Sequence, residues 1–151
     1  MPDLKQFCTF YLDSHFFGVE VLEVQEIIRS QPMTRLPLAP AVFRGLINLR
    51  GQIVTALDLR QRLELPPSAR DRSLVNVVVK SEGGAVSMLV DDIGDVVEVD
   101  ASSFEEPPET LGGVARKLVR GVYKLKDRLL LHLDTQRTIA GPQSGSEGAG
   151  H

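Results

Sequence analysis

Short apolar runs recur along this chain every eight to twelve residues, separated by Gly, Pro, Asp and Asn. This spacing is typical of an all-β sandwich or barrel. In the last run, Leu129, Leu131 and Leu133 share one face and leave His132 on the other, as in a half-buried strand. The pattern predicts ten strands, at residues 7–12, 16–21, 33–36, 46–50, 52–58, 74–80, 85–91, 95–100, 118–125 and 128–134.

One segment, residues 22–29, follows a helical period instead. Val24, Ile27 and Ile28 lie at positions i, i+3 and i+4, and charged side chains occupy other faces of the segment. We expect a short amphipathic helix there. The predicted fold class is therefore all-β with short helices.

An internal repeat supports a division of the ten strands into two sets of five. Residues 44–59 align without a gap over residues 120–135, and residues 24–27 align over residues 93–96, at offsets of 76 and 69. The first alignment pairs Arg44 with Arg120, Gly45 with Gly121, Leu49 with Leu125, Leu57 with Leu133 and Asp58 with Asp134. We infer two related five-stranded β-barrels that pack on each other and share a hydrophobic core.

The two barrels are expected to form one folded unit, residues 1–140, with subdomain one at about 7–65 and subdomain two at about 72–139. Pro66–Pro67 marks the break between them. From residue 141 the sequence GPQSGSEGAGH has no large apolar side chain to offset the entropy of ordering. We predict a disordered tail at 141–151.

Composition limits the classes of function. The 17 basic and 20 acidic side chains leave a formal net charge of −3, which is too balanced for a typical polyanion binder. One cysteine cannot form an internal disulfide, which fits a reducing, cytoplasmic setting. No segment approaches about 18 uninterrupted apolar residues, so we expect neither export nor direct membrane insertion.

Charge is distributed unevenly despite the small total. Residues 91–109 hold eight acidic side chains and no basic one, whereas residues 116–128 hold six basic side chains against Asp127 alone. Such runs are either solvated faces or docking surfaces. Nucleic acid is a weak candidate partner, because only Tyr123 in the basic stretch could stack on a base.

The sequence carries none of the common catalytic signatures: the dinucleotide-binding glycine motif, the P-loop, the zinc-protease motif and the nucleophile elbow are all missing. Cys8 is interpreted as a small core residue, His132 as a surface histidine, and Asp91–Asp92 as turn residues rather than cation ligands. We therefore expect no enzyme activity, no cofactor and no metal.

The segment around residues 46–58 predicts a β-hairpin with Gly51 at its turn, where glycine adopts a positive φ most easily. Arg50 then stands at the hairpin tip. Three roles remain open for it: an ordinary exposed arginine, an ion pair with Glu26 of the preceding segment, or direct contact with a partner.

The runs GLINLRGQIV and LDLR, with VEVLEVQEI upstream and VDDIGDV downstream, closely resemble the CheW-like domain family of bacterial chemotaxis coupling proteins. The resemblance extends from Phe7 to Ile139, and residues 48–51 are a specific mark of the family. It implies Src-homology-3-like barrels on a shared core, in agreement with the two sets of strands. It also implies a non-catalytic adaptor that links the regulatory domain of the histidine kinase CheA to the cytoplasmic tip of methyl-accepting chemoreceptors.

In this family the receptor binds in a groove between the barrels. By resemblance, the groove of this chain involves Val24, Glu26, Ile27, Arg50, Val75 and Val96, while Gly45, Asn48, Leu49 and Gly51 shape the hairpin. An apolar cleft with a few polar anchors suits a helical partner such as a receptor tip. The implied location is the cytoplasm, with recruitment to receptor clusters at the inner face of the membrane.

Other functions stay open beside this one. Similar adaptors serve related chemosensory pathways that control surface motility or gene expression. A nucleic-acid-binding barrel and an enzyme are the less favoured alternatives.

Overall fold

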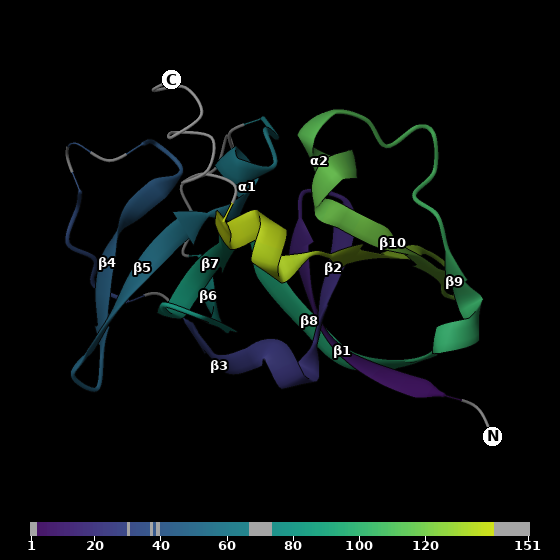
Figure 1. Cartoon of the computed structure of the whole chain (residues 1–151), viewed down its shortest axis with the longest axis horizontal. Helices are drawn as coiled ribbons and strands as arrows, with labels where there is room; N and C mark the ends of the chain where they lie inside the picture. The colour runs from purple at the N-terminus through teal and green to yellow at the C-terminus, as the bar shows by residue number, and fades with distance from the viewer. Residues whose placement is uncertain (1–2, 30, 37, 39, 67–73, 141–151) are drawn as a thin grey trace.

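The computed structural model describes residues 3–29, 31–36, 38, 40–66 and 74–140. Within them the chain forms two β-sheets connected by short helices (Figure 1). The all-β prediction with short helices is confirmed. The tail predicted at 141–151 lies outside the described residues, as does the stretch 67–73 between the two predicted subdomains.

The six-stranded sheet runs in the order β8 (Asp92–Asp100), β1 (Leu4–Leu12), β2 (His15–Glu20), β11 (Leu129–Leu133), β10 (Val119–Lys124) and β9 (Phe104–Glu105). The five-stranded sheet runs in the order β3 (Val24–Arg29), β6 (Val75–Ser81), β7 (Gly84–Val90), β5 (Gln52–Asp58) and β4 (Phe43–Leu49). The helices are η1 (Val21–Glu23), α1 (Leu59–Arg62), η2 (Ala101–Ser103) and α2 (Gly113–Leu118), and residues 135–140 are also helical. None of these described helices is long and apolar enough to cross a membrane.

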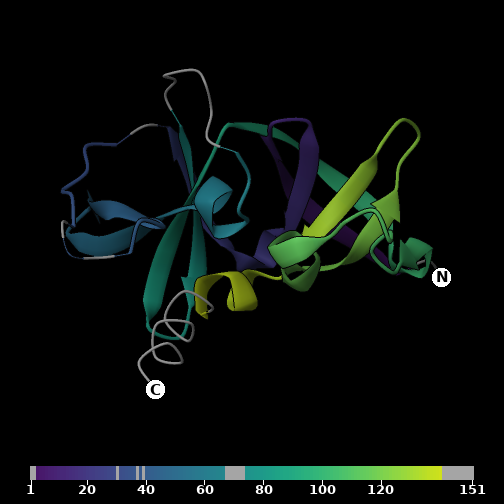
Figure 2. The same ribbon diagram turned by 90° about the horizontal axis from the view of Figure 1, so that it is seen from above.

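Each sheet contains strands from both halves of the sequence. β1 and β2 lie beside β11 and β10, while β6 and β7 lie beside β3 and β5. Figure 2 shows the result: one lobe joins the purple N-terminal strands to the green and yellow C-terminal ones, and the other lobe is blue and teal. The prediction that each half of the chain builds its own barrel is therefore wrong, because hydrophobic alternation marks a strand without specifying its neighbour.

The predicted repeat is nevertheless present in the topology. Offsetting β1, β2 and β3 by 69 residues places them on β6, β7 and β8, and offsetting β4 and β5 by 76 residues places them on β10 and β11. The same offsets relate the two parallel pairings, Phe17 with Leu131 and Val86 with Thr55. Each half thus contributes equivalent strands, exchanged between two similar sheets.

Three apolar clusters explain how the sheets are held. The largest draws on both sheets, with Phe10, Phe17 and Leu133 from one and Val77 and Met88 from the other, and it forms the shared core. A second cluster contains only residues of the six-stranded sheet, including Phe7, Phe16, Val99, Tyr123 and Leu130. A third contains Ile47, Val54 and Val78 of the five-stranded sheet. Because each of these smaller clusters is buried by a single sheet, each sheet must curve around its own interior.

Two local predictions fail. Residues 22–29 do not form an amphipathic helix: Val21–Glu23 is one turn of 3₁₀ helix, and β3 then pairs with β6. In so short a segment the helical and strand periodicities of apolar residues are hard to distinguish. The β-branched Val24, Ile27 and Ile28 suit a strand that can pair with its neighbour. Residues 33–36 make only an isolated bridge, between Thr34 and Leu46. β9 is a strand that the pattern did not predict.

Candidate functional site

The candidate surface centres on β3, which lies at an edge of the five-stranded sheet. Side chains along it alternate between half-buried and exposed. Val24 and Ile28 pack against the apolar clusters, while Ile27 points outward and keeps 37% of its surface exposed. An edge strand has one neighbouring strand only, and among the described residues no strand pairs with the other side of β3.

The β4–β5 hairpin forms as the sequence predicts. Leu49 pairs with Gln52, so Arg50 and Gly51 are the two turn residues, with φ values of 53° and 89°. Positive φ at both positions is the geometry of a type I′ turn, which matches the twist of the flanking strands. The Asn48 side chain closes the turn, since its Oδ1 accepts a hydrogen bond of 2.8 Å from the Gly51 amide.

Arg50 reaches from this hairpin to β3. Its Nη2 donates to Oε1 of Glu26 in an ion pair, although β3 and β4 are at opposite edges of the sheet order. The pair therefore links the two edges of the curved sheet. The Arg50 side chain remains 80% exposed and the Glu26 side chain 18% exposed. Of the three roles open for Arg50, the ion pair is present, and the exposed guanidinium leaves room for a partner as well.

Gly45 and Leu49 hold the hairpin in place. A Cβ at Gly45 would collide with the carbonyl oxygen of Thr34, whose backbone crosses the hairpin here and exchanges two hydrogen bonds of 2.8 Å with Leu46. Leu49 packs against the interior cluster of the five-stranded sheet. Gly121, the repeat equivalent of Gly45, likewise leaves no room for a Cβ, because Phe104 and the Glu105 carbonyl crowd it.

The two remaining predicted groove residues behave differently. Val96 is 58% exposed on β8, an edge strand of the other sheet, where it pairs with Cys8. Val75 is only 3% exposed and belongs to the shared core, so its side chain cannot contact a partner in this conformation. The structure thus brings Val24, Glu26, Ile27 and Arg50 together around β3, places Val96 at a second exposed edge, and removes Val75 from the surface.

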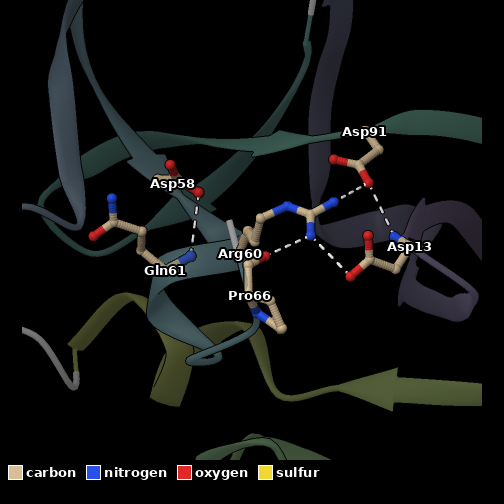
Figure 3. Close-up of polar contacts among 6 residues, drawn as sticks. All are labelled: Asp13, Asp58, Arg60, Gln61, Pro66 and Asp91. Atoms are coloured by element: carbon tan, nitrogen blue, oxygen red, sulfur yellow. Dashed lines mark hydrogen bonds and ion pairs between the residues drawn. The ribbon is translucent and has the colours of Figure 1, made fainter. Parts of the chain in front are cut away.

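A buried ion-pair network joins the two sheets (Figure 3). Arg60 of α1 donates to Asp91, to Asp13 Oδ2 at 2.8 Å and to the Pro66 carbonyl at 2.8 Å. Asp91 also accepts a hydrogen bond of 2.9 Å from the Asp13 amide. Burial by itself would lower the pKa of Arg60, but the hydrogen bond from Arg60 to Asp13 and the charge of Asp91 outweigh it and raise that pKa.

This network was not predicted from the sequence. Asp91 is not merely a turn residue, because its carboxylate is buried and paired with Arg60. Asp13 lies in the β1–β2 turn and Asp91 between β7 and β8, so only the folded chain brings them to Arg60. No local pattern in the sequence marks such a meeting of three segments.

His132 is not a surface residue, contrary to the sequence-based interpretation. Only 3% of its surface is exposed, because β11 is central in its sheet and both of its faces are covered, one by the shared core and the other by the interior cluster. Its ring packs edge-on against Phe7, with the ring centroids 4.8 Å apart. Burial is the main reason that the pKa of His132 falls to about 4, so the imidazole is neutral at pH 7.

Cys8 is a buried residue of β1, as predicted. Burial raises the pKa of its thiol, which leaves the protonated, unreactive form at neutral pH.

The arrangement matches a known family. Residues 6–143 match the model of the CheW-like domain. The chain belongs to the CheW-like domain family. The chemotaxis protein CheW of Klebsiella aerogenes is 28% identical over 139 residues, which cover 92% of this chain and 84% of that protein.

Two further relatives bear on fold and role. The crystal structure of the scaffolding protein TtCheW from Thermoanaerobacter tengcongensis superposes with a TM-score of 0.81 and 25% identity, covering 91% of this chain and 92% of that one. Protein PilI of Pseudomonas aeruginosa is 25% identical over 116 residues, which cover 76% of this chain and 64% of that protein. The two-sheet architecture is therefore that of a CheW-type scaffolding protein.

Proposed function

We propose that this chain is a non-catalytic adaptor that couples methyl-accepting chemoreceptors to the regulatory domain of the histidine kinase CheA. The observation that carries the proposal is the match of residues 6–143 to the CheW-like domain. This range covers both sheets except the first two residues of β1. The adaptor works in the cytoplasm and joins receptor clusters at the inner face of the membrane.

The receptor-binding surface is centred on β3 and the hairpin tip. Ile27 supplies an exposed apolar contact on an edge strand, and the Glu26–Arg50 pair supplies a polar anchor beside it. Val96 adds an apolar contact from β8. Exposed aliphatic side chains with a few oriented polar groups suit the apolar face of a partner helix.

Coupling needs no chemistry in this protein. The two sheets share one core, and the Arg60 network ties their connecting segments together, so the adaptor moves as a stiff body. A receptor rearrangement that changes the position of the adaptor then favours one state of the kinase, because only differential contacts shift such an equilibrium.

The first test is Ile27→Asp, with Leu129→Asp as its matched control. The two side chains are 37% and 38% exposed, but Leu129 lies on β11 in the other sheet. Burying the exposed part of an isoleucine is worth roughly 1 kcal/mol, and desolvating a carboxylate there costs more, so we expect at least about tenfold weaker binding of a receptor tip.

The measurement is calorimetric titration of each purified variant with a receptor-tip fragment, and separately with a CheA regulatory domain. Ile27→Asp should lose receptor affinity while keeping its thermal unfolding curve and its kinase affinity. Unchanged receptor binding, or an equal loss in Leu129→Asp, would remove β3 from the proposed surface. Failure of the native chain to bind either partner would overturn the adaptor function itself.

A second pair of variants separates the two roles of Arg50. Arg50→Ala removes both the ion pair with Glu26 and any contact of Arg50 with a partner. Glu26→Gln removes the ion pair but leaves the positive charge of Arg50 in place. If Arg50 contacts the receptor, Arg50→Ala weakens binding clearly more than Glu26→Gln. Equal losses would mean that the pair acts only by holding the hairpin against β3.

A related pathway is the second candidate, favoured by the similarity to PilI. Deleting the gene in its own organism and scoring swimming chemotaxis against surface motility distinguishes the two. Loss of directed swimming with normal surface movement supports the chemotaxis assignment, and the reverse result supports the alternative.

A further inference from the structure

His132 has a polar environment that the adaptor function does not explain. Neither Nδ1 nor Nε2 has a hydrogen-bond partner among the residues that the structure describes, although 97% of the residue is buried from solvent, since 3% is exposed. A buried nitrogen without a partner is destabilising, so buried side-chain nitrogens are nearly always hydrogen-bonded or bound to an ion. A bound ligand would satisfy these His132 nitrogens.

Two carboxylates lie next to this imidazole. Glu20 ends β2 and Glu23 lies in η1, and one oxygen of each falls within 4.8 Å of the other and of a His132 nitrogen. Both glutamates are half-buried, and burial is the main reason that the pKa of Glu23 is raised, with the Glu20 charge next. Two carboxylates held this close repel each other, and a cation between them would relieve that repulsion.

We propose that Glu20, Glu23 and His132 form a binding site for a divalent transition metal of the zinc class. One imidazole nitrogen and two carboxylate oxygens are ligands that zinc accepts, whereas magnesium and calcium prefer an all-oxygen set. Ligand atoms on one tetrahedral zinc lie about 3.3–3.6 Å apart, given bonds of about 2.0–2.2 Å. Side-chain rotation of the two glutamates closes the distance, and water completes the coordination.

The other charges acting on His132 sum to one net positive charge, fewer than the two negative charges of the glutamates. Arg120 and Lys5 act electrostatically on His132 and oppose a cation, while Asp134 acts in the opposite sense. The Arg120 guanidinium is drawn toward Asp134, with Nε and Oδ2 3.5 Å apart. The two glutamates therefore decide the local sign of the charge, and the cluster attracts a cation.

The position of the cluster gives the metal a structural role. Glu23 belongs to η1, the connection that carries the chain from β2 in one sheet to β3 in the other. His132 is on β11, beside β2 in the six-stranded sheet. A bound ion would fasten this crossover to β11 and so fix the start of β3, which carries the proposed receptor surface.

The test is titration of the metal-free full chain with Zn²⁺ by calorimetry, with Mg²⁺ as the comparison ion. We expect one zinc ion per chain, no magnesium binding at this site, and at least tenfold weaker zinc binding in Glu20→Gln and in Glu23→Gln. The matched controls are Glu98→Gln, an exposed carboxylate on β8, and His15→Gln, and both should bind zinc as the native chain does.

The imidazole provides a readout that does not depend on a substitution. Zinc should shift the ¹⁵N resonance of one His132 ring nitrogen in the native chain and leave His15 unchanged. A native chain that binds no zinc, glutamate variants that bind it as tightly as the native chain, or a His132 resonance that does not respond would each overturn the site. These results are independent of receptor and kinase binding, so the adaptor function stands or falls separately.

Discussion

The ion-pair network between the sheets allows a sharp test by two nearly identical substitutions. Asp91→Asn and Asp13→Asn each remove one negative charge that faces Arg60, with no change in side-chain size. The environments differ: the Asp91 side chain is 5% exposed and the Asp13 side chain 43% exposed, while that of Arg60 is 8% exposed. The two variants should therefore differ widely in stability.

The expected magnitudes follow from that burial. Removing one partner of a buried pair typically costs about 3–5 kcal/mol, and Arg60 keeps its more exposed partner Asp13, so we expect Asp91→Asn to lose about 3 kcal/mol of unfolding free energy, the low end of that range. An exposed pair is worth about 0–1 kcal/mol, which sets the expected loss for Asp13→Asn. Asn also tolerates the left-handed backbone at residue 13, where φ is 55°, so the second variant adds little strain.

The assay is urea and thermal unfolding followed by far-ultraviolet circular dichroism, since the chain has no tryptophan. At about 2–4 °C per kcal/mol for a chain of this size, Asp91→Asn should lower the Tm by roughly 6–12 °C and Asp13→Asn by less than about 4 °C. Equal losses in the two variants, or a loss below about 1 kcal/mol in Asp91→Asn, would refute the view that the buried Arg60–Asp91 pair stabilises the contact between the two sheets.

Three further predictions concern buried features. Gly45→Ala should cost several times more unfolding free energy than Gly83→Ala, because a Cβ at Gly45 meets the Thr34 carbonyl while one at Gly83 meets nothing within 4 Å; urea midpoints compare the two. The folded pKa of His132 lies below its unfolded value of 6.5, so its contribution to stability is complete above about pH 6.5 and declines toward pH 4; unfolding with a chelator present, compared between the native chain and His132→Gln, should show this slope only in the native chain. Cys8, buried and with a raised pKa, should react with a thiol reagent at least about tenfold faster in urea than in buffer, and equal rates would contradict its burial.

Local sequence patterns were sufficient for much of the fold. Alternation and turn residues predicted nine of the strands, and the Arg50–Gly51 turn follows from the conformational freedom of glycine. The repeat predicted equivalent strands at offsets of 69 and 76, which the topology follows. The strands and the turn depend on near neighbours in the chain, and the repeat is found by aligning two stretches of sequence, so the sequence expresses all of these features directly.

The candidate surface was only partly predictable. The resemblance placed Ile27 and Arg50 at exposed positions, and the Glu26–Arg50 pair was one of the alternatives that charge chemistry allowed. Val75 shares a strand face with Val77 and Val79, opposite Asn76 and Lys80, so alternation alone favoured the core although the resemblance placed Val75 in the groove. The segment that contains Glu26 was predicted as a helix and is a strand, because its pairing with β6 outweighs the weak helical periodicity of its apolar residues.

The sequence by itself determined nine of the eleven described strands, the hairpin turn, the aliphatic core and the internal repeat. The strands and the turn depend on residues close together in the chain, and the core composition and the repeat can be found by inspecting the sequence directly. Only the tertiary structure decided that the halves exchange strands, that His132 is enclosed beside Glu20 and Glu23, and that Arg60 meets two aspartates from other segments. The physical reason is common to all three. A strand or a charge carries no local mark of its distant partner, and that partner is selected when the whole chain buries its apolar faces and pairs its buried charges.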